Sequence, residues 1–142
     1  MGEGGQGEVR ECKHRKSGEK RAVKMMVKDM MDENDQELLK NEISALKSLD
    51  HPNIIKIYEC FEDNLNYYIV TELCNGGELF DQIIARKFTE YEAALTIKTI
   101  LSCINVCHKN DIVHRDLKPE NIMLDKDKGF DEIKLIDFGT SV

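Results

Sequence analysis

The sequence has no tryptophan, only two prolines and no excess of positive charge among its 142 residues. Lys and Arg number 20 against 27 Asp and Glu, which gives a net charge of -7. Because the phosphates of nucleic acids are bound mainly by Lys and Arg, this balance argues against a nucleic-acid partner and favours a basic peptide. No apolar run approaches the roughly 18 residues that a membrane-crossing helix needs. We therefore expect one soluble domain with a sizeable core and no membrane partner.

The cysteines do not suggest a disulfide framework. Five is an odd number, the five are scattered along the chain, and no secretory leader is evident, so we expect reduced thiols and a cytoplasmic location. Cys103 and Cys107 precede His108, but their spacing is not that of a C-x-x-C-H haem site. Residues four apart lie on one face of a helix, so packing is the favoured interpretation of this pair rather than a metal site.

A polar run between two apolar segments is the most informative part of the chain. Residues 114–121 read His-Arg-Asp-Leu-Lys-Pro-Glu-Asn, and Asp-Phe-Gly follows at 137–139. These residue types are common on surfaces, and a solvated loop is the alternative interpretation. A solvated loop seldom combines an aspartate to orient a hydroxyl, a lysine to stabilise a phosphate, and an asparagine and aspartate to hold a divalent cation. The two runs therefore predict a site for phosphoryl transfer.

Both runs match, letter for letter and in order, the H-R-D-L-K-x-x-N and D-F-G motifs, so the sequence resembles the eukaryotic protein kinases. The resemblance implies that Asp116 orients the substrate hydroxyl and that Lys118 stabilises charge on the transferring phosphate. It also implies that Asn121 and Asp137 ligate magnesium. Lys118 followed by Pro-Glu is similar to the serine/threonine group rather than to the tyrosine group. The resemblance further implies an internal apolar column, formed by Leu46, Ile57, His114 and Phe138.

A glycine-rich stretch opens the chain. Residues 2–9 fit the pattern G-x-G-x-x-G-x-V, which by itself is also typical of a flexible end. The residues that follow predict strand, turn and strand rather than a helix, at 9–12 and 22–27, and this favours the protein-kinase loop over a dinucleotide fingerprint. The resemblance implies that three glycines present backbone N–H groups to the nucleotide phosphates, namely Gly2, Gly4 and Gly7.

Lys24 lies inside the second of these apolar strands, where a lysine that extends its amine to water is one interpretation. The next helix favours another. It is predicted to begin with a capping box at 34–37, and its apolar residues recur at helical spacing on a stripe that includes Glu42. A buried carboxylate needs a partner, and Lys24 can supply one. In the kinases such a lysine pairs with the helix glutamate and contacts the nucleotide phosphates; an exposed position for Glu42 is the alternative.

Two further predicted strands, at 55–61 and 67–71, would complete a small antiparallel sheet. By resemblance, Thr71 lies at the back of the adenine pocket. The backbone of Glu72 and Cys74 would then form the hinge that hydrogen-bonds the base, so that their side chains matter little. The resemblance places four more residues around adenine and ribose, namely Val9, Ala22, Met123 and Glu78.

A second capping box, at 89–92, predicts a long helix that ends near residue 109. Its apolar stripe is predicted to contain Ala94, Ile97, Leu101, Ile104 and Cys107. The acidic turn at 125–129 looks at first like a calcium loop. It lacks glycine at the sixth loop position, Phe130, and glutamate at the twelfth, Ile136, so we expect a surface turn.

The predicted fold class is α+β, with the two lobes of a protein kinase and ATP between them. Residues 1–74 would form an antiparallel-sheet lobe with one helix and the hinge, and residues 75–142 the start of a mainly helical lobe through the Asp-Phe-Gly motif. By resemblance the domain is truncated, because the first strand and the activation segment are missing. We therefore expect the long helix to expose apolar surface.

The resemblance implies an ATP-dependent protein serine/threonine kinase that uses Mg2+, acts as a monomer and prefers basic residues upstream of the Ser or Thr it phosphorylates. The segments at 49–54, 76–81 and 137–142 are most similar to the calmodulin-dependent and calcium-dependent protein kinases. The fragment alone is expected to transfer phosphate weakly or not at all. Two alternatives stay open: a non-catalytic nucleotide-binding or protein-interaction module left by truncation, and a small-molecule kinase of related fold, which the run Leu-Lys-Pro-Glu argues against.

Overall fold

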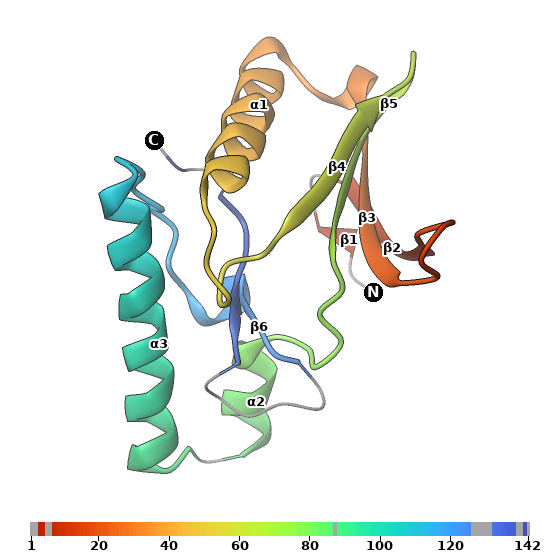
Figure 1. The fold of residues 1–142 in the computed structure, drawn as a ribbon. Coiled ribbons are helices and arrows are strands. Elements are labelled where there is room, and N and C mark those ends of the chain that lie inside the picture. The colour runs from red at the N-terminus through yellow and green to blue at the C-terminus, as the bar shows by residue number, and fades with distance from the viewer. Residues whose placement is uncertain (1–2, 5–6, 87, 126–131, 139–140, 142) are drawn as a thin grey trace.

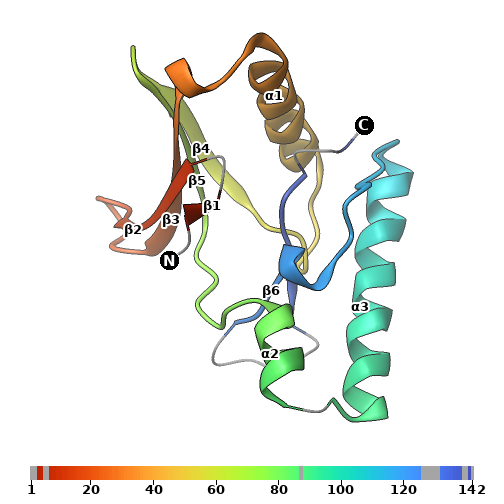
Figure 2. The same cartoon turned by 180° about the vertical axis from the view of Figure 1, so that it is seen from behind.

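A computed structural model describes residues 3–4, 7–86, 88–125, 132–138 and 141 of the chain. Their elements are, in chain order, β1 (Glu3–Gly4), β2 (Gly7–Lys13), β3 (Lys20–Val27), a 3-10 turn (Lys28–Met30), α1 (Glu33–Ser48), β4 (Ile57–Glu62), β5 (Asn66–Glu72), α2 (Leu79–Ala85), α3 (Glu90–Lys109), a second 3-10 turn (Pro119–Asn121), β6 (Ile122–Met123) and β7 (Lys134–Leu135). Figures 1 and 2 show the sheet with α1 in the upper part of the molecule and α2 beside α3 in the lower part. The predicted α+β class is confirmed. No described helix is long and apolar enough to span a membrane.

The five-stranded sheet has the order β1-β2-β3-β5-β4, and all of its neighbours are antiparallel. Ala22 lies opposite Thr71, and Lys24 opposite Ile69, so these side chains share one face of the sheet. The predicted strand at 55–61 begins later than expected, at Ile57, because the backbone N–H of Ile55 donates to the carbonyl of Leu135 at 3.0 Å instead of joining the sheet. Residues before β4 thus bind the segment that leads to the Asp-Phe-Gly motif.

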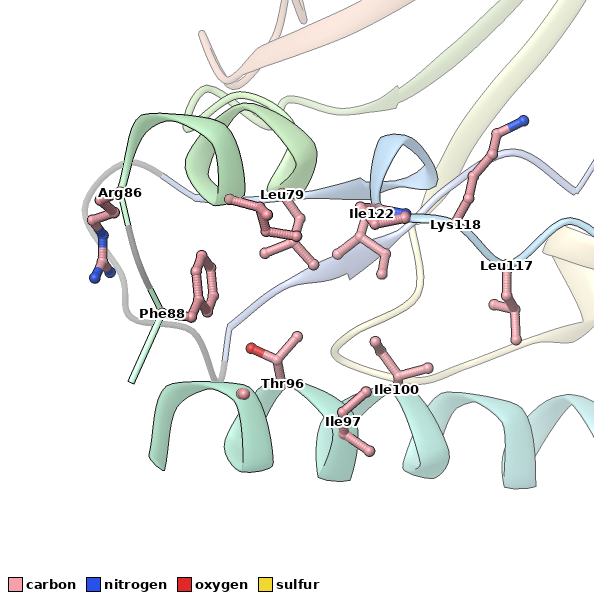
Figure 3. Close-up of a pocket in the computed structure, with 12 residues that line it drawn as sticks. Leu79, Arg86, Phe88, Thr96, Ile97, Ile100, Leu117, Lys118 and Ile122 are labelled. Carbon is pink, nitrogen blue, oxygen red and sulfur yellow. The ribbon is translucent and has the colours of Figure 1, made fainter. Parts of the chain in front are cut away.

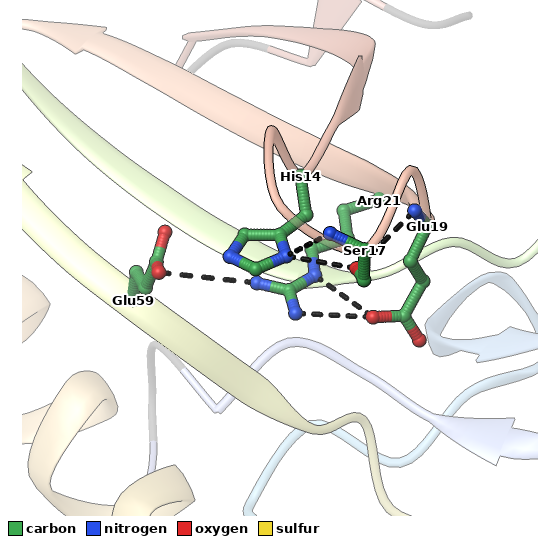
Figure 4. Close-up of polar contacts among 5 residues, drawn as sticks. All are labelled: His14, Ser17, Glu19, Arg21 and Glu59. Atoms are coloured by element: carbon green, nitrogen blue, oxygen red, sulfur yellow. Dashed lines mark hydrogen bonds and ion pairs between the residues drawn. The ribbon is translucent and has the colours of Figure 1, made fainter.

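An arginine ties β3 to the strand at the far edge of the sheet (Figure 4). The Arg21 guanidinium donates to Glu19 at 3.0 and 3.3 Å, and it lies 3.9 Å from Glu59 of β4. Its carbon also lies 3.9 Å from the centre of the Tyr58 ring, a cation–π contact. Arg21 is only 9% exposed, so this stacking and pairing compensate for its burial. The outer face of the sheet is therefore cross-linked at the end nearest the predicted hinge.

Helix α1 begins earlier than the sequence suggested. Its N-cap is Asp32, whose carboxylate accepts from the Asp35 backbone N–H at 2.8 Å, while the Asp35 carboxylate accepts from the Asp32 backbone N–H at 3.3 Å. The predicted box at 34–37 is wrong because Asp32 offers the same short acceptor two residues earlier, and a helix begins where both N–H groups are satisfied. The helix buries Leu39, Glu42 and Leu46 against the sheet and core.

Helix α3 begins with the predicted capping box, since Thr89 accepts from the Glu92 backbone N–H at 3.2 Å. Its buried residues are Thr96, Thr99, Cys103 and Cys107, of which only Cys107 belongs to the predicted stripe, while Ile104 of that stripe is partly buried against the core. Ile97 and Leu101 are instead 56% and 62% exposed. Both sets recur at helical spacing, and the fully buried positions are those with the smaller side chains. The expected exposure of apolar surface on this helix is confirmed.

The larger core surrounds Phe138, which is fully buried. Leu46 belongs to the same cluster, and Ile57 packs against it. The His114 ring meets the Phe138 ring edge-on, with 4.6 Å between centroids. The four members of the predicted apolar column therefore belong to one packed group.

We predict that Asp32→Ala lowers the free energy of unfolding by about 1 kcal/mol, because the capping hydrogen bond from the Asp35 backbone N–H to the Asp32 carboxylate is lost. Asn34→Ala is the matched control, since Asn34 is exposed and makes no capping bond in the described structure. Chemical denaturation of both variants measures the difference. A larger loss in the Asn34 variant would show that the helix begins at the originally predicted position.

Candidate active site

Three of the predicted catalytic and metal residues form one hydrogen-bonded group. The Lys118 amine donates to Asp116 Oδ2 at 2.7 Å, and the Asn121 side-chain amide donates to the same oxygen at 2.9 Å. Asn121 also donates to the Asp116 backbone carbonyl at 2.9 Å. The hydrogen bond from Lys118 is the main cause that lowers the pKa of Asp116, and Asn121 acts in the same direction. Asp116 is therefore ionised at neutral pH and able to accept a proton from a nearby hydroxyl.

The loop that carries Asp116 is shaped by His114. This imidazole is 1% exposed, with Nε2 3.2 Å from the Ile136 carbonyl and Nδ1 accepting from the Asp116 backbone N–H at 3.3 Å. Burial is the main cause that lowers the pKa of His114, which favours the neutral ring that these two contacts require. Between them, Arg115 has a left-handed backbone with φ of 64°. The strained turn directs the Asp116 carboxylate toward Lys118 and Asn121.

Asp137 approaches this group because β6 pairs with β7. Ile122 lies opposite Leu135, and the Ile136 backbone N–H donates to the Asn121 carbonyl at 2.9 Å. The hydrogen bond to Asp116 is the main cause that raises the pKa of Lys118, and the negative charge of Asp137 raises it further. Because the Asn121 amide nitrogen is already engaged, its oxygen is the atom available to a cation. An amide oxygen and a carboxylate are ligands that suit Mg2+.

The described residues of the glycine-rich segment, 3–4 and 7–9, lie in β1 and β2, which pair as antiparallel strands. Gly7 has a φ of 146°, and a Cβ atom there would lie 2.3 Å from the Met25 carbonyl oxygen. Only glycine therefore allows this close approach of β2 to β3. Val9 lies opposite Lys24, and Gly4 pairs with Gly7. Gly2 is outside the described residues.

Glu42 is buried on α1 and only 9% exposed, as its position on the helix predicted. Burial raises its pKa; the Lys24 charge lowers it, and the Asp137 charge raises it further. Lys24 and Glu42 thus sense each other's charge, although no ion pair joins them within the described structure. Lys24 and Glu42 therefore lie in the same region, but the predicted ion pair between them is not formed.

The predicted hinge has a feature that the sequence did not indicate. Thr71, which is predicted to lie at the back of the adenine pocket, donates its hydroxyl hydrogen to the Glu72 carbonyl at 3.1 Å. The Glu72 carboxylate, to which no role was assigned, accepts from the Lys56 backbone N–H at 2.7 Å and from the Lys134 amine at 2.8 and 2.9 Å. A lysine inside the apolar strand 133–136 was the signal available in the sequence. Burial raises the pKa of the Cys74 thiol to about 11, so this cysteine acts by packing.

The segment after the hinge pairs with the strand after the catalytic loop. The Gly76 backbone N–H donates to the Leu124 carbonyl at 2.9 Å, and the Leu124 N–H donates to the Gly77 carbonyl at 2.9 Å. A Cβ atom on Gly76 would lie 2.6 Å from the Leu124 oxygen. The next pair brings Glu78 beside Met123, so these two predicted nucleotide contacts are neighbours.

Comparison with known proteins places this geometry in a family. The model of the protein kinase domain matches residues 1–142. The chain belongs to the protein kinase family. It is 51% identical over 144 residues to calcium-dependent protein kinase 4 of Plasmodium falciparum, covering 99% of this chain and 27% of that protein. It is 45% identical over 134 residues to calcium-dependent protein kinase 8 of Arabidopsis thaliana, covering 92% of this chain and 25% of that protein.

The kinase chain thus spans about a quarter of the length of these relatives. Protein kinases use ATP together with Mg2+ and act on proteins. The residues predicted to carry such chemistry lie in the present chain on the loop of residues 114–121, on β3, on α1 and just after β7.

An apolar cavity of about 700 Å³ lies between α2 and α3 of the kinase chain, below the catalytic loop. Figure 3 shows Leu79 and Phe88 facing Thr96 and Ile100 across it, and its residues include Lys118. Among the described side chains, the Thr96 hydroxyl is the one buried polar group without a hydrogen-bond partner. This cavity continues the exposed apolar face of α3.

We predict that the stability difference between Glu42→Gln and the unaltered chain depends on pH. Burial raises the pKa of Glu42 above its ordinary value of 4.5, so this group stabilises the fold below about pH 4.5 and loses that contribution as pH rises through the raised pKa. The glutamine of the variant does not titrate, so the stability of the variant has no such loss as pH rises. The free energy of unfolding of the variant should therefore rise relative to that of the unaltered chain as pH increases above about 4.5 and through the raised pKa of Glu42.

Denaturant titrations at several pH values measure this difference. Glu37→Gln is the control, because Glu37 is exposed on the same helix and should follow the unaltered chain. A difference for Glu42→Gln that does not change with pH would contradict the buried carboxyl.

Proposed function

We propose that this chain carries the nucleotide-binding and catalytic residues of an ATP-dependent protein serine/threonine kinase, which transfers the γ-phosphoryl group of Mg-ATP to a Ser or Thr hydroxyl. The observation that supports this most directly is the shared hydrogen bonding of Lys118 and Asn121 to Asp116 Oδ2. Residues 1–74 act as the sheet lobe with the hinge, and residues 75–142 as the start of the helical lobe.

In this proposal Asp116 accepts the proton of the substrate hydroxyl as the oxygen attacks the γ-phosphorus. Its Oδ2 is held by two donors, so Oδ1 is oriented toward the substrate. Lys118 carries a positive charge beside it and stabilises the negative charge that develops on the transferring phosphoryl group. The two roles need the loop geometry that His114 maintains.

The nucleotide is held by residues from both halves of the chain. Asn121 and Asp137 would hold Mg2+, which neutralises phosphate charge when bound. The glycine segment supplies backbone N–H groups, and Lys24, supported by Glu42, contacts the phosphates. The residues assigned to adenine and ribose are Val9, Ala22, Thr71, Glu72, Cys74, Glu78 and Met123.

The substrate is a protein with basic residues upstream of the phosphorylated hydroxyl, which the net charge of -7 and the acidic Glu78 and Glu120 support. The similarity to proteins named calcium-dependent protein kinases supports the serine/threonine class. All five cysteines are free thiols, which supports a reducing, cytoplasmic setting. We propose that the active unit is a monomer.

A second candidate is a non-catalytic binding module. The apolar cavity between α2 and α3, with the exposed Ile97 and Leu101, favours it, because such surface is typical of a site that another polypeptide covers. The two candidates differ in phosphate transfer rather than in nucleotide binding.

We predict that Mg-ATP at about 100 times its dissociation constant stabilises the chain by roughly 2.7 kcal/mol. Thermal unfolding with and without the nucleotide measures this, and Asp137→Ala should abolish the magnesium-dependent part. No shift in the unaltered chain would contradict a formed nucleotide site.

We predict that Asp116→Asn keeps the Mg-ATP stabilisation but lowers phosphate transfer to a basic serine peptide by about 10²- to 10⁴-fold, because the proton acceptor is lost. Transfer from radiolabelled ATP measures the rate under single-turnover conditions. Equal transfer by the variant and the unaltered chain would contradict the role proposed for Asp116, whereas nucleotide binding with no measurable transfer fits both an inactive kinase fragment and the binding module.

A further inference from the structure

The carboxylate of Glu72 is the centre of a polar junction behind the hinge. Its Oε1 accepts from the Lys56 backbone N–H at 2.7 Å, while the Glu72 backbone N–H donates to the Lys56 carbonyl at 3.0 Å. Residues 56 and 72 are therefore joined by two opposed hydrogen bonds, one of them through a side chain.

The third member of the junction is Lys134 at the start of β7. Its amine lies 2.9 Å from Glu72 Oε1 and 2.8 Å from Oε2, so it faces both carboxylate oxygens. The side chains of Lys134 and Glu72 are only 19% and 22% exposed. Charge pairs that are largely withdrawn from water are screened little by salt and are costly to break from one side.

The junction connects two parts of the proposed nucleotide site that are far apart in sequence. Glu72 ends β5, and its backbone carbonyl already accepts from the Thr71 hydroxyl at 3.1 Å. Lys134 lies on β7, where the Leu135 backbone N–H donates to the Asn53 carbonyl at 2.8 Å. The same short strand leads directly to Asp137.

We propose that the Glu72–Lys134 ion pair positions the hinge peptide for recognition of the adenine base and fixes it relative to the strand that carries Asp137. This inference rests on the proposed function. Lys134 and the Glu72 carboxylate act as positioning residues, because they hold the backbone that contacts the base rather than the nucleotide itself. The pair therefore affects the base more than the phosphates.

The physical reason is that an adenine-binding backbone group must be oriented before the ligand arrives. A hinge peptide that is free to rotate would lose conformational entropy on binding, which lowers affinity. The two hydrogen bonds to residue 56 and the bidentate contact with Lys134 remove that freedom beforehand. Because the carboxylate does the holding, the side chain at position 72 becomes part of the recognition of the base.

The test compares the affinity for a ligand that contains adenine with the affinity for a ligand that has only the phosphates. Fluorescence or calorimetric titration gives the dissociation constants of Mg-ATP and of Mg-tripolyphosphate for the unaltered chain, Glu72→Gln and Lys134→Met. We expect each variant to weaken ATP binding by about tenfold, on the scale of one charge-assisted contact, and to leave tripolyphosphate binding within about twofold.

Matched controls separate the ion pair from general effects of charge. Glu59→Gln removes an exposed carboxylate on the neighbouring strand, and Lys56→Met removes a lysine whose contact with Glu72 is through its backbone. Both should bind ATP like the unaltered chain. Lys134→Arg should restore ATP binding, and the Glu72→Gln/Lys134→Met double variant should be no weaker than either single variant.

The outcomes separate this inference from the proposed function. If the unaltered chain binds ATP and the two variants keep its affinity, or if ATP and tripolyphosphate weaken equally, the positioning role is overturned while the nucleotide site stands. If the unaltered chain does not bind Mg-ATP, both are overturned. Thermal unfolding of each variant identifies one that has failed to fold, and in that case Lys134→Gln decides by the same ratio of dissociation constants.

Discussion

The geometry of the candidate site depends on one buried, neutral imidazole. His114 contacts the Ile136 carbonyl through Nε2 and receives the Asp116 backbone N–H on Nδ1, so a single ring fixes residues beside both acidic groups of the site. The pKa of His114 is lowered by burial, so the ring keeps one donor and one acceptor nitrogen at neutral pH. A protonated ring would carry a second N–H directed at the Asp116 N–H. The arrangement of the proposed catalytic loop and of the proposed metal ligands is thus linked to the packing of the core.

Backbone strain accompanies this constraint. Arg115 and Asp137 have φ angles of 64° and 61°, a region that L-residues adopt at a cost of about 1–3 kcal/mol each. Neither position is glycine, so the strain is held by neighbours: the His114 contacts on one side, and the burial of Phe138 on the other. Residues in such conformations turn their side chains away from the direction that a regular strand would give. In this chain both turns direct a carboxylate toward the same space.

The fold class and the composition of the site could be predicted from sequence because their determinants are local. The motif around Asp116 specifies its own loop, and Glu42 lies on an apolar stripe that requires burial. The buried face of α3 could not be predicted, since small and large residues both recur at helical spacing and only the partner surface selects between them. The start of α1 could not be predicted either, because Asp32 and Asn34 both carry a short side chain with an oxygen that can cap a helix. The Glu72–Lys134 contact joins residues far apart in the chain, and no local pattern encodes it.

The close backbone contact at Gly76 has a consequence for chance variation in this chain. The space between Gly76 and Leu124 excludes even one methyl group, because a Cβ atom would lie 2.6 Å from a backbone oxygen that has little room to move. Replacement of this glycine would therefore force apart the backbones of residues 76 and 124, beside the bridge between Glu78 and Met123, while leaving the residues of both kinase motifs unchanged. Such a variant would keep every residue of the motifs and would still differ in the backbone that they depend on. At position 76 even alanine, the smallest side chain after glycine, would disturb the structure.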